Sequence, residues 1–246
     1  MTKIQRSILV VGIALAVVGL SSASGQANPL AGKIIALDAG HGGTSLGAQY
    51  PADSGYNGKI FEKDVNLAVV YALKSKLEAD GAKVVLTRKC DEVLSNKGRA
   101  DIATAECKLL GRKCDVLVSV HHNGNVDPGH DGTLVIYNGR TDKKFATIMH
   151  DALVGGLGLL DEGYLSGGYG ITIFGNFVSV LTESYYITNT TEAEVNLAGI
   201  PSVVCDSNGD GTNDYSVLAG QRTQEEVNAL YSGLINYFSV APLPRK

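Results

Sequence analysis

The chain has 246 residues, of which 44% are hydrophobic and 19% are charged, and its formal net charge is −4. This length and composition predict one globular domain with a sizeable core and argue against intrinsic disorder. The acidic balance argues against a general nucleic-acid binder, because such a protein presents a basic face to phosphates.

Residues 1–27 have the layout of a secretory signal peptide. The segment MTKIQRS carries two basic residues, a run of thirteen apolar residues follows, and SSASGQA is small and polar. A membrane anchor is the alternative, but a span needs about 20 apolar residues. We therefore expect cleavage near Ala27, export to a periplasm, the exterior or the cell wall, and no stable membrane anchor afterwards. Residues 28–246 would then form a single domain, with 19 basic against 25 acidic residues.

Hydrophobic patterning predicts strands and helices along residues 28–246. Continuous apolar runs indicate buried strands, and apolar residues that recur every three to four positions indicate helices. Thr223 and Glu226 have the spacing of a capping box at the start of the last helix, whose apolar face runs to Phe238. The predicted elements are, in chain order, strand 33–37, helix 63–80, strand 83–87, helix 97–110, strand 115–120, strand 133–137, helix 142–154, strand 176–183 and the C-terminal helix.

This order of elements is typical of an α/β protein. Strands that alternate with helices form βαβ units, which place mostly parallel strands in one sheet and helices on both of its faces. The ligands of such open sheets bind beyond the carboxyl ends of the strands. Residues at those ends are therefore the candidates for a functional site.

Four candidate residues lie at such positions. His41 follows the first strand in the glycine-rich segment LDAGHGG, Glu62 opens the first helix, His121 ends the strand DVLVSV, and Glu183 ends the strand FVSVL. Two histidines and one carboxylate suit a catalytic zinc ion, which keeps a fourth position for water and acidifies it. A second carboxylate can take the proton and pass it to a leaving amine. These residues together suffice to hydrolyse an amide bond.

Each of these residues alone also fits a structural role. A loop histidine is often a surface group, and Glu62 can simply favour the positive N-terminus of its helix. The ligand spacings of 21 and 59 residues match no short zinc motif. The glycines of LDAGHGG favour the functional interpretation, because they let the backbone turn sharply and approach a ligand closely.

Four segments of the chain, in this order, resemble the zinc-dependent N-acetylmuramoyl-L-alanine amidases of the Amidase_3 family. They are DAGHGG, FEKDVN, SVHHNG and LTESYYITN, and the likeness extends over about residues 33–238. Four motifs in a fixed order are more specific than any one of them. The resemblance implies a twisted, mostly parallel mixed sheet flanked by helices on both faces.

The resemblance also implies roles for the four candidate residues. In the four segments, the positions of the family's Zn²⁺ ligands are held by His41, Glu62 and His121. The position of its catalytic carboxylate is held by Glu183. The implied reaction cleaves the amide bond between N-acetylmuramic acid and L-alanine, with peptidoglycan or a muropeptide as the substrate. Two alternatives stay open, namely a zinc peptidase or carboxypeptidase that acts on another amide, and a catalytically silent wall-binding module.

Other residues in or near these segments are expected to have supporting roles. His122 adjoins His121, and neighbouring strand residues face opposite sides, so only one of the two can reach the metal. We expect His122 to lie behind a ligand or at the surface. Arg88 and Arg99 are expected to pair with nearby acids, and Asn189 is expected to shape a turn.

Residues 199–220 depart most from the family pattern. The segment DSNGDGTND within them has the oxygen-bearing residues of a calcium loop at positions 1, 3, 5 and 9 and a glycine at position 6. Position 12 lacks the glutamate of an EF-hand, and a polar turn is the alternative. The predicted Ca²⁺ ligands are Asp206, Asn208, Asp210, the carbonyl of Thr212, and Asp214.

The four cysteines predict disulfides, because an even number in an exported protein favours disulfides over a metal site. Cys107 lies near the end of a predicted helix and Cys114 precedes the next strand, so both would lie at the base of the sheet. Cys90 and Cys205 both follow elements that end at the opposite rim. The pairs Cys107–Cys114 and Cys90–Cys205 are therefore favoured, although the spacing alone leaves other connectivities open.

Overall fold

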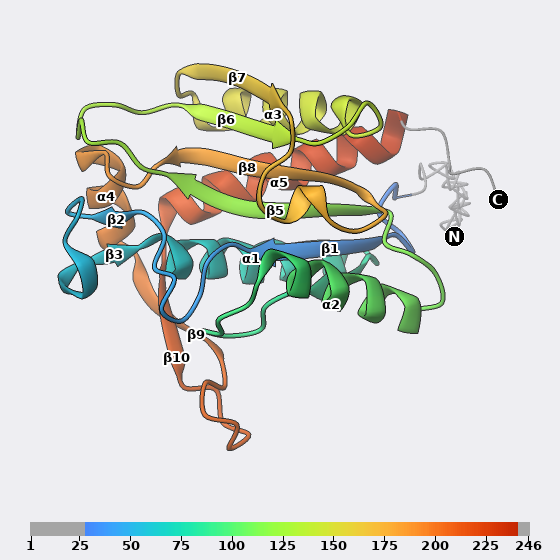
Figure 1. Ribbon diagram of the computed structural model, residues 1–246, viewed down its shortest axis with the longest axis horizontal. Helices are drawn as coiled ribbons and strands as arrows, with labels where there is room; N and C mark the ends of the chain where they lie inside the picture. Colours follow the sequence, from blue (N-terminus) through green and yellow to red (C-terminus); the bar gives the residue numbers. More distant parts are fainter. Residues whose placement is uncertain (1–27, 241–246) are drawn as a thin grey trace, which may run out of the picture.

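The computed structural model describes residues 28–240, so the predicted signal peptide at residues 1–27 lies outside the described part of the chain. One central sheet runs through the molecule (Figure 1). Its six strands are, in spatial order, β4 (Lys83–Leu86), β1 (Ile34–Ala39), β5 (Val116–Asn123), β8 (Val178–Tyr186), β6 (Thr133–Tyr137) and β7 (Asp161–Ser166). The first four strands are parallel, β6 is antiparallel to β8, and β7 is parallel to β6.

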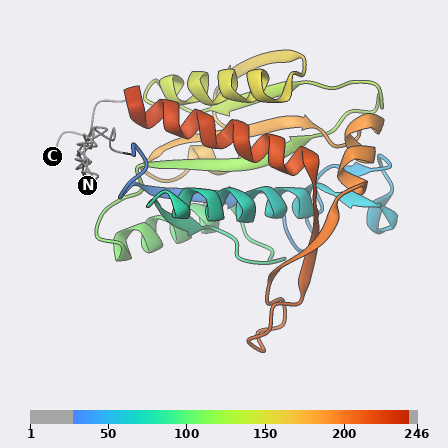
Figure 2. The same ribbon diagram turned by 180° about the vertical axis from the view of Figure 1, so that it is seen from behind.

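Helices cover both faces of this sheet. On one face lie α1 (Glu62–Ala79), α3 (Lys143–Leu157) and α5 (Gln221–Val240), which Figure 2 shows in front of the strands. On the other face lie α2 (Asn96–Leu109) and the 3₁₀ helix η2 (Gly170–Ile173). The predicted α/β class with a mostly parallel mixed sheet is therefore confirmed. Within residues 28–240, no helix is both long and apolar enough to cross a membrane.

An apolar layer on each face of the sheet forms the core. The larger layer joins the sheet to α1, α3 and α5 and includes the fully buried side chains of Leu37, Leu73 and Leu230. The smaller layer joins the sheet to α2 and η2 and includes Ala103 and Ile171. Burial of each large apolar side chain contributes roughly 1.5–3 kcal/mol. The two layers therefore fix the helices and the strand ends relative to one another.

The carboxyl ends of β1, β5 and β8 meet at one edge of the sheet. β5 lies between the other two, and His121 of β5 pairs with Glu183 of β8. Helix α1 begins at the same edge, directly after β3 (Ile60–Phe61), which pairs with β2 (Gln49–Tyr50). The fold therefore brings the ends of three strands and the start of one helix together.

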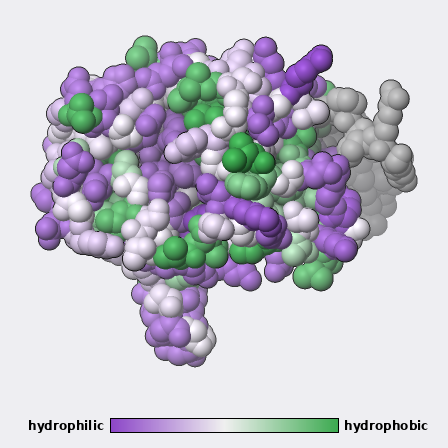
Figure 3. Space-filling view, in the orientation of Figure 1, coloured by the Kyte–Doolittle hydropathy of each residue, from purple (hydrophilic) through white to green (hydrophobic). Residues whose placement is uncertain are grey.

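Residues 199–220 form an antiparallel hairpin of β9 (Ile200–Cys205) and β10 (Tyr215–Ala219). The hairpin projects from the body of the molecule (Figure 1), and its tip is mostly hydrophilic (Figure 3). It follows the short helix α4 (Thr190–Leu197), which Asn189 caps with its side chain. The 3₁₀ turn η1 (Gly55–Asn57) separates β2 from β3. Strands β7, β9 and β10 and helix α4 are not among the predicted elements.

Both favoured disulfides are present. Cys107 of α2 is bonded to Cys114, and Cys90 is bonded to Cys205 at the end of β9. The first disulfide spans 7 residues and the second spans 115 residues. The second one therefore ties the hairpin to a distant part of the chain, the segment that follows β4.

The predicted capping box at the start of the C-terminal helix is wrong. Helix α5 begins at Gln221, and the hydroxyl of Thr223 accepts a hydrogen bond from the N–H of Gly220 at 3.3 Å. Glu226 is fully buried instead, with its Oε1 2.6 Å from the hydroxyl of Ser184. A buried carboxylate needs hydrogen-bond partners, and Glu226 finds them in the core rather than at the helix end.

Candidate metal centre

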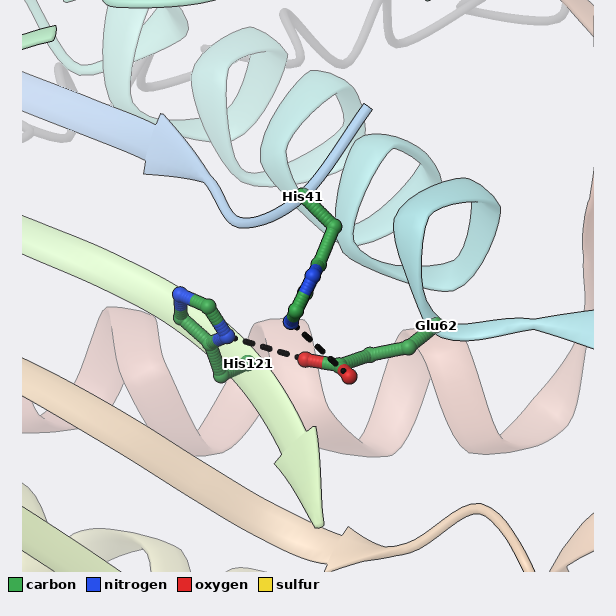
Figure 4. A group of neighbouring side chains, drawn as sticks. All are labelled: His41, Glu62 and His121. Carbon is green, nitrogen blue, oxygen red and sulfur yellow. Dashed lines mark hydrogen bonds and ion pairs between the residues drawn. The ribbon is translucent and has the colours of Figure 1, made fainter. Parts of the chain in front are cut away.

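His41, Glu62 and His121 converge at the carboxyl edge of the sheet (Figure 4). One nitrogen of each imidazole and one oxygen of the carboxylate all lie within 4.8 Å of one another. The three residues come from the loop after β1, the first turn of α1 and the end of β5. Among residues 28–240, this is the only group of three or more histidine, cysteine, aspartate or glutamate side chains arranged so that they can hold a metal ion.

Glu62 lies between the two imidazoles. Its Oε2 is 3.1 Å from Nε2 of His41, and its Oε1 is 2.9 Å from Nδ1 of His121. Backbone N–H groups of Ala48 and His122 donate to the same two oxygens. Burial alone raises the pKa of Glu62, but hydrogen bonds and charge from His121 and His41 outweigh it and hold the pKa below its ordinary value. The carboxylate is therefore ionised and oriented, as a metal ligand must be.

Two glycines make room for these side chains. A Cβ atom at Gly40 would lie 2.2 Å from Cε1 of His121, and one at Gly47 would lie 2.3 Å from Oε2 of Glu62. His41 itself has a φ of 60°, a left-handed conformation that residues other than glycine seldom adopt. Such strain persists where the surrounding structure imposes it, often at functional sites. The glycine-rich loop thus turns His41 towards Glu62.

Glu183 shares a cavity of about 450 Å³ with these three residues. Within the described residues, its Oε2 is buried and has no hydrogen-bond partner. Burial and, after it, the negative charge of Glu62 raise the pKa of Glu183 well above its ordinary value. A carboxyl group in this state can hold a proton near neutral pH and release it. A buried oxygen without a partner is rare in proteins and fits a group that is paired only when metal or substrate is bound.

His122 lies behind the site and not at the surface. It is buried, its Nδ1 is 2.7 Å from Oδ1 of Asn66, and its Nε2 is 2.9 Å from Oε2 of Glu226. Asn66 in turn donates to the carbonyl of Gly40 at 3.1 Å. His122 therefore supports the loop of the site through Asn66, and of the two adjacent histidines only His121 faces Glu62.

Arg99 and Arg88 both hold the loop that carries His41. Arg99 pairs with Asp38 at 2.9 Å and also donates to the carbonyl of His41. Arg88 donates to the carbonyl of Gly40 at 3.1 Å and to other backbone carbonyls nearby. The expected pairing with acids is therefore confirmed for Arg99 and wrong for Arg88, whose buried guanidinium is satisfied by the backbone.

The three aspartates among the five predicted Ca²⁺ ligands, Asp206, Asp210 and Asp214, form no group of the kind seen at His41, Glu62 and His121. They lie at the tip of the hairpin, where Asp206 and Asp210 accept hydrogen bonds from backbone N–H groups of the same loop. These hydrogen bonds lower the pKa of both carboxyl groups. Such hydrogen bonds are typical of a polar turn, and the calcium prediction stays without support.

Some residues that line the cavity are absent from the sequence-based candidates. Asn96 lies at the start of α2, and Tyr169 lies just before η2. Tyr169 is 65% exposed and stands between Gly168 and Gly170. The glycine-rich stretch GGYG is the only signal in the sequence that could have pointed to it. The position of Asn96 depends on the packing of α2 and has no local signature.

A family model and several known proteins match this chain. The model of the Amidase_3 family, described as N-acetylmuramoyl-L-alanine amidase, matches residues 35–196. The chain belongs to this family. The protein YqiI of Bacillus subtilis (strain 168) is 31% identical over 198 residues, which are 79% of this chain and 88% of YqiI.

Two further relatives are named as N-acetylmuramoyl-L-alanine amidases. The N-acetylmuramoyl-L-alanine amidase LytC of Bacillus subtilis (strain 168) is 29% identical over 170 residues, which are 68% of this chain and 32% of LytC. The solved catalytic domain of CwlV, an N-acetylmuramoyl-L-alanine amidase from Bacillus (Paenibacillus) polymyxa var. colistinus, superposes with a TM-score of 0.64 at 28% identity. That superposition covers 85% of this chain and 99% of the CwlV domain.

Membership of the family confirms the resemblance seen in the four sequence segments. The activity of the chain is therefore that of an N-acetylmuramoyl-L-alanine amidase, which hydrolyses the amide bond between N-acetylmuramic acid and L-alanine in peptidoglycan. The comparisons favour this activity over a peptidase for another amide and over a silent wall-binding module. Such a substrate gives the amidase a role at the cell wall.

Proposed function

We propose that this amidase depends on zinc and that His41, Glu62 and His121 are the zinc ligands. One observation carries the proposal. Two imidazoles and a buried carboxylate, with ligand atoms within 4.8 Å of one another, border the cavity that Glu183 also lines. Catalytic zinc sites use three protein ligands of these types and leave a fourth position open. A zinc ion held there would polarise the scissile carbonyl group and acidify a water molecule.

We propose that Glu183 is the catalytic acid and base of the reaction. Its raised pKa lets it hold a proton at the buried, unpaired Oε2 and deliver it to the nitrogen of the leaving L-alanine. Its place opposite His121 keeps the carboxyl group in the cavity that receives the amide. Asn96 and Tyr169 line the same cavity and would lie beside a substrate bound there.

The two adjacent histidines provide the test of the ligand assignment. His121→Ala and His122→Ala are purified with the wild type, zinc is counted per chain, and the release of stem peptides from peptidoglycan is measured. We expect His121→Ala to lose both zinc and activity. His122→Ala should keep more zinc and activity than His121→Ala, and it should unfold more readily than the wild type because Glu226 would lose a buried partner. A wild type that carries no zinc and releases nothing after zinc is supplied would rule the proposal out.

We also propose that residues 1–27 are a cleaved signal peptide and that residues 28–246 are the exported catalytic domain. The charged, apolar and small-residue parts of residues 1–27 support this division. The two disulfides favour an oxidising compartment, in agreement with a substrate in the cell wall. Mass spectrometry of the protein recovered from outside the cytoplasm tests the proposal. An N-terminus at Met1 in that fraction would contradict cleavage.

A further inference from the structure

The segment 88–93, which follows β4, packs directly against the glycine-rich loop that carries His41. A Cβ atom at Gly42 would lie 2.3 Å from the carbonyl oxygen of Glu92, and one at Gly43 would lie 2.3 Å from Cγ2 of Val93. The backbone of the loop therefore rests on segment 88–93 without side chains of its own in between. A shift of that segment would move the loop with it.

Asp91 holds this loop through Gly43. Its Oδ1 accepts the N–H of Gly43 at 2.7 Å, and its Oδ2 accepts Nζ of Lys63 at 2.7 Å. Lys63 also donates to the carbonyl of Gly43 at 3.1 Å, so the three residues close a ring. The Lys63 and Asp91 side chains are only 11% and 21% exposed, so water weakens their attraction less than at an open surface. The ring joins the loop of His41 to the helix start at Glu62.

The hairpin of β9 and β10 reaches the same two elements. Cys90, which precedes Asp91, is bonded to Cys205 at the end of β9. The hydroxyl group of Tyr215, at the start of β10, donates a 2.6 Å hydrogen bond to Oδ1 of Asp64. Asp64 lies in the first turn of α1. The hairpin therefore bridges segment 88–93 and the start of α1, as the ring around Asp91 does.

We propose that Asp91 is a positioning residue of the metal centre and that the Cys90–Cys205 disulfide holds Asp91 where it fixes the loop of His41. This inference rests on the proposed role of His41 as a zinc ligand. Ligands that are oriented before the metal binds lose less freedom on binding, which is why residues that orient metal ligands raise metal affinity. None of the residues of the hairpin lines the cavity, so the hairpin acts on the site by holding segment 88–93 in place.

A purely stabilising disulfide would give a different result. A disulfide that closes a long loop acts mainly on the unfolded chain, so its removal lowers the free energy of unfolding. It does not by itself change the affinity of the folded protein for a metal. Zinc affinity measured on folded protein therefore separates a positioning role from a stabilising one.

Zinc affinity of Asp91→Ala is the first test, measured by competition with a chromophoric chelator. The control is Asp101→Ala, because Asp101 forms an ion pair with Lys97 on the exposed side of α2. We expect Asp91→Ala to weaken zinc binding by up to about tenfold, the lower end of the effect of losing a group bonded directly to a metal ligand, because Asp91 acts on His41 through Gly43. Asp101→Ala should leave it unchanged. If Asp91→Ala does not fold, Asp91→Asn takes its place in the comparison. Asp91→Asn keeps an acceptor for the N–H of Gly43 but loses the charge that pairs with Lys63.

The two disulfides provide a matched pair of variants. Cys90→Ser with Cys205→Ser should weaken zinc binding, and Cys107→Ser with Cys114→Ser should not. Asp91→Ala should also be introduced into the variant that lacks the Cys90–Cys205 disulfide. The further loss of zinc affinity there should be smaller than the loss that Asp91→Ala causes in the wild type, because both changes act on one loop. Amide hydrogen exchange of residues 40–46 in the metal-free protein should quicken in Asp91→Ala and in the first disulfide pair, but not in Asp101→Ala or in the second pair. This measurement needs neither zinc nor activity.

Equal zinc affinities of folded Asp91→Ala and Asp101→Ala would overturn the inference. Equal affinities of the two disulfide variants would overturn the part assigned to the hairpin. A wild type that binds no zinc contradicts the proposed function instead. In that case the hydrogen exchange of residues 40–46 still decides whether Asp91 and the disulfide hold the loop.

Discussion

His121 and Glu183 lie opposite each other on the neighbouring parallel strands β5 and β8. Residues in register on neighbouring strands project to the same side of a sheet, so both side chains reach one cavity. On the far side of Glu183 the sheet becomes antiparallel, with Leu134 of β6 as its partner. The proposed metal ligand and the proposed acid are therefore held at a fixed separation by the backbone hydrogen bonds of the sheet.

Glu183→Gln tests the role of this carboxyl group. The substitution keeps the shape of the side chain but removes its ability to carry a proton between water and the leaving amine. We expect the release of stem peptides to fall by about 10²–10⁴-fold, the usual contribution of general acid–base catalysis, while zinc content stays at the wild-type level. Glu78→Gln, at an exposed carboxylate paired with Lys74, is the control. Full activity of Glu183→Gln would remove Glu183 from the mechanism.

Gly40→Ala tests the close approach of the backbone to His121. Gly40 has a φ that other residues also adopt, so the added methyl group causes no backbone strain, but its Cβ would lie 2.2 Å from the imidazole. The imidazole of His121 or the loop at Gly40 must therefore shift, which changes the position of His121 relative to His41 and Glu62. We expect zinc affinity to fall by roughly 10–100-fold, as when the orientation of a ligand is lost, and zinc titration of the folded protein measures it.

Gly155→Ala is the matched control for this substitution. Gly155 lies on the exposed side of α3, and a Cβ atom there would meet nothing within 4 Å. Alanine favours a helix interior over glycine by about 0.5–1 kcal/mol, so this variant should be slightly more stable and bind zinc normally. If both variants bind zinc equally well, the contact between Gly40 and His121 has no part in placing the ligand.

The sheet and the convergence of the four candidate residues could be predicted because their signals are local. The run VLVSV at residues 116–120 is apolar except for Ser119, a pattern typical of a strand buried on both faces, and β5 forms there. His41, His121 and Glu183 each stand at the end of such a run, and parallel strands in one sheet place those ends together. Their roles in binding zinc and moving protons stay a prediction.

Other features depend on contacts between distant residues and have no local signal. Glu226 has the spacing of a cap, yet it turns into the core because Ser184 and His122 offer partners there. Strand β7 has no apolar run to predict it, because its side chains are mostly exposed at the edge of the sheet. Asp91 belongs to an unremarkable polar loop, and only the fold places it beside Gly43.

The two disulfides should contribute unequally to the stability of the fold. Loop-closure entropy grows with the length of the closed loop, which is 7 residues for Cys107–Cys114 and 115 residues for Cys90–Cys205. On that basis, removal of the first pair should lower the free energy of unfolding by about 2 kcal/mol and removal of the second by about 5 kcal/mol. Urea unfolding of the two double serine variants, each without metal, measures both values. A larger loss for the short loop would contradict this order.

Asp38 should make stability depend on pH in the acid range. Burial raises its pKa, but Arg99, Ser119 and Thr87 together lower it below the ordinary value of about 3.9. A carboxyl group whose pKa is lowered in the folded state stabilises the fold above its unfolded pKa, and this contribution is lost as the pH falls through the folded pKa.

Asp38→Asn is the variant that isolates this contribution. It leaves the buried Arg99 without its 2.9 Å charge partner, so the free energy of unfolding should fall by about 3–5 kcal/mol near neutral pH. The difference from wild type should begin to shrink as the pH drops below about 4, where Asp38 binds a proton in the unfolded chain, and should shrink further as the pH falls towards the lowered pKa of the folded state. Urea unfolding of metal-free protein between about pH 7 and pH 3 measures it, with Asp101→Asn as an exposed control. A difference that stays constant over this range would mean that the Asp38 charge does not hold Arg99 and its loop in place.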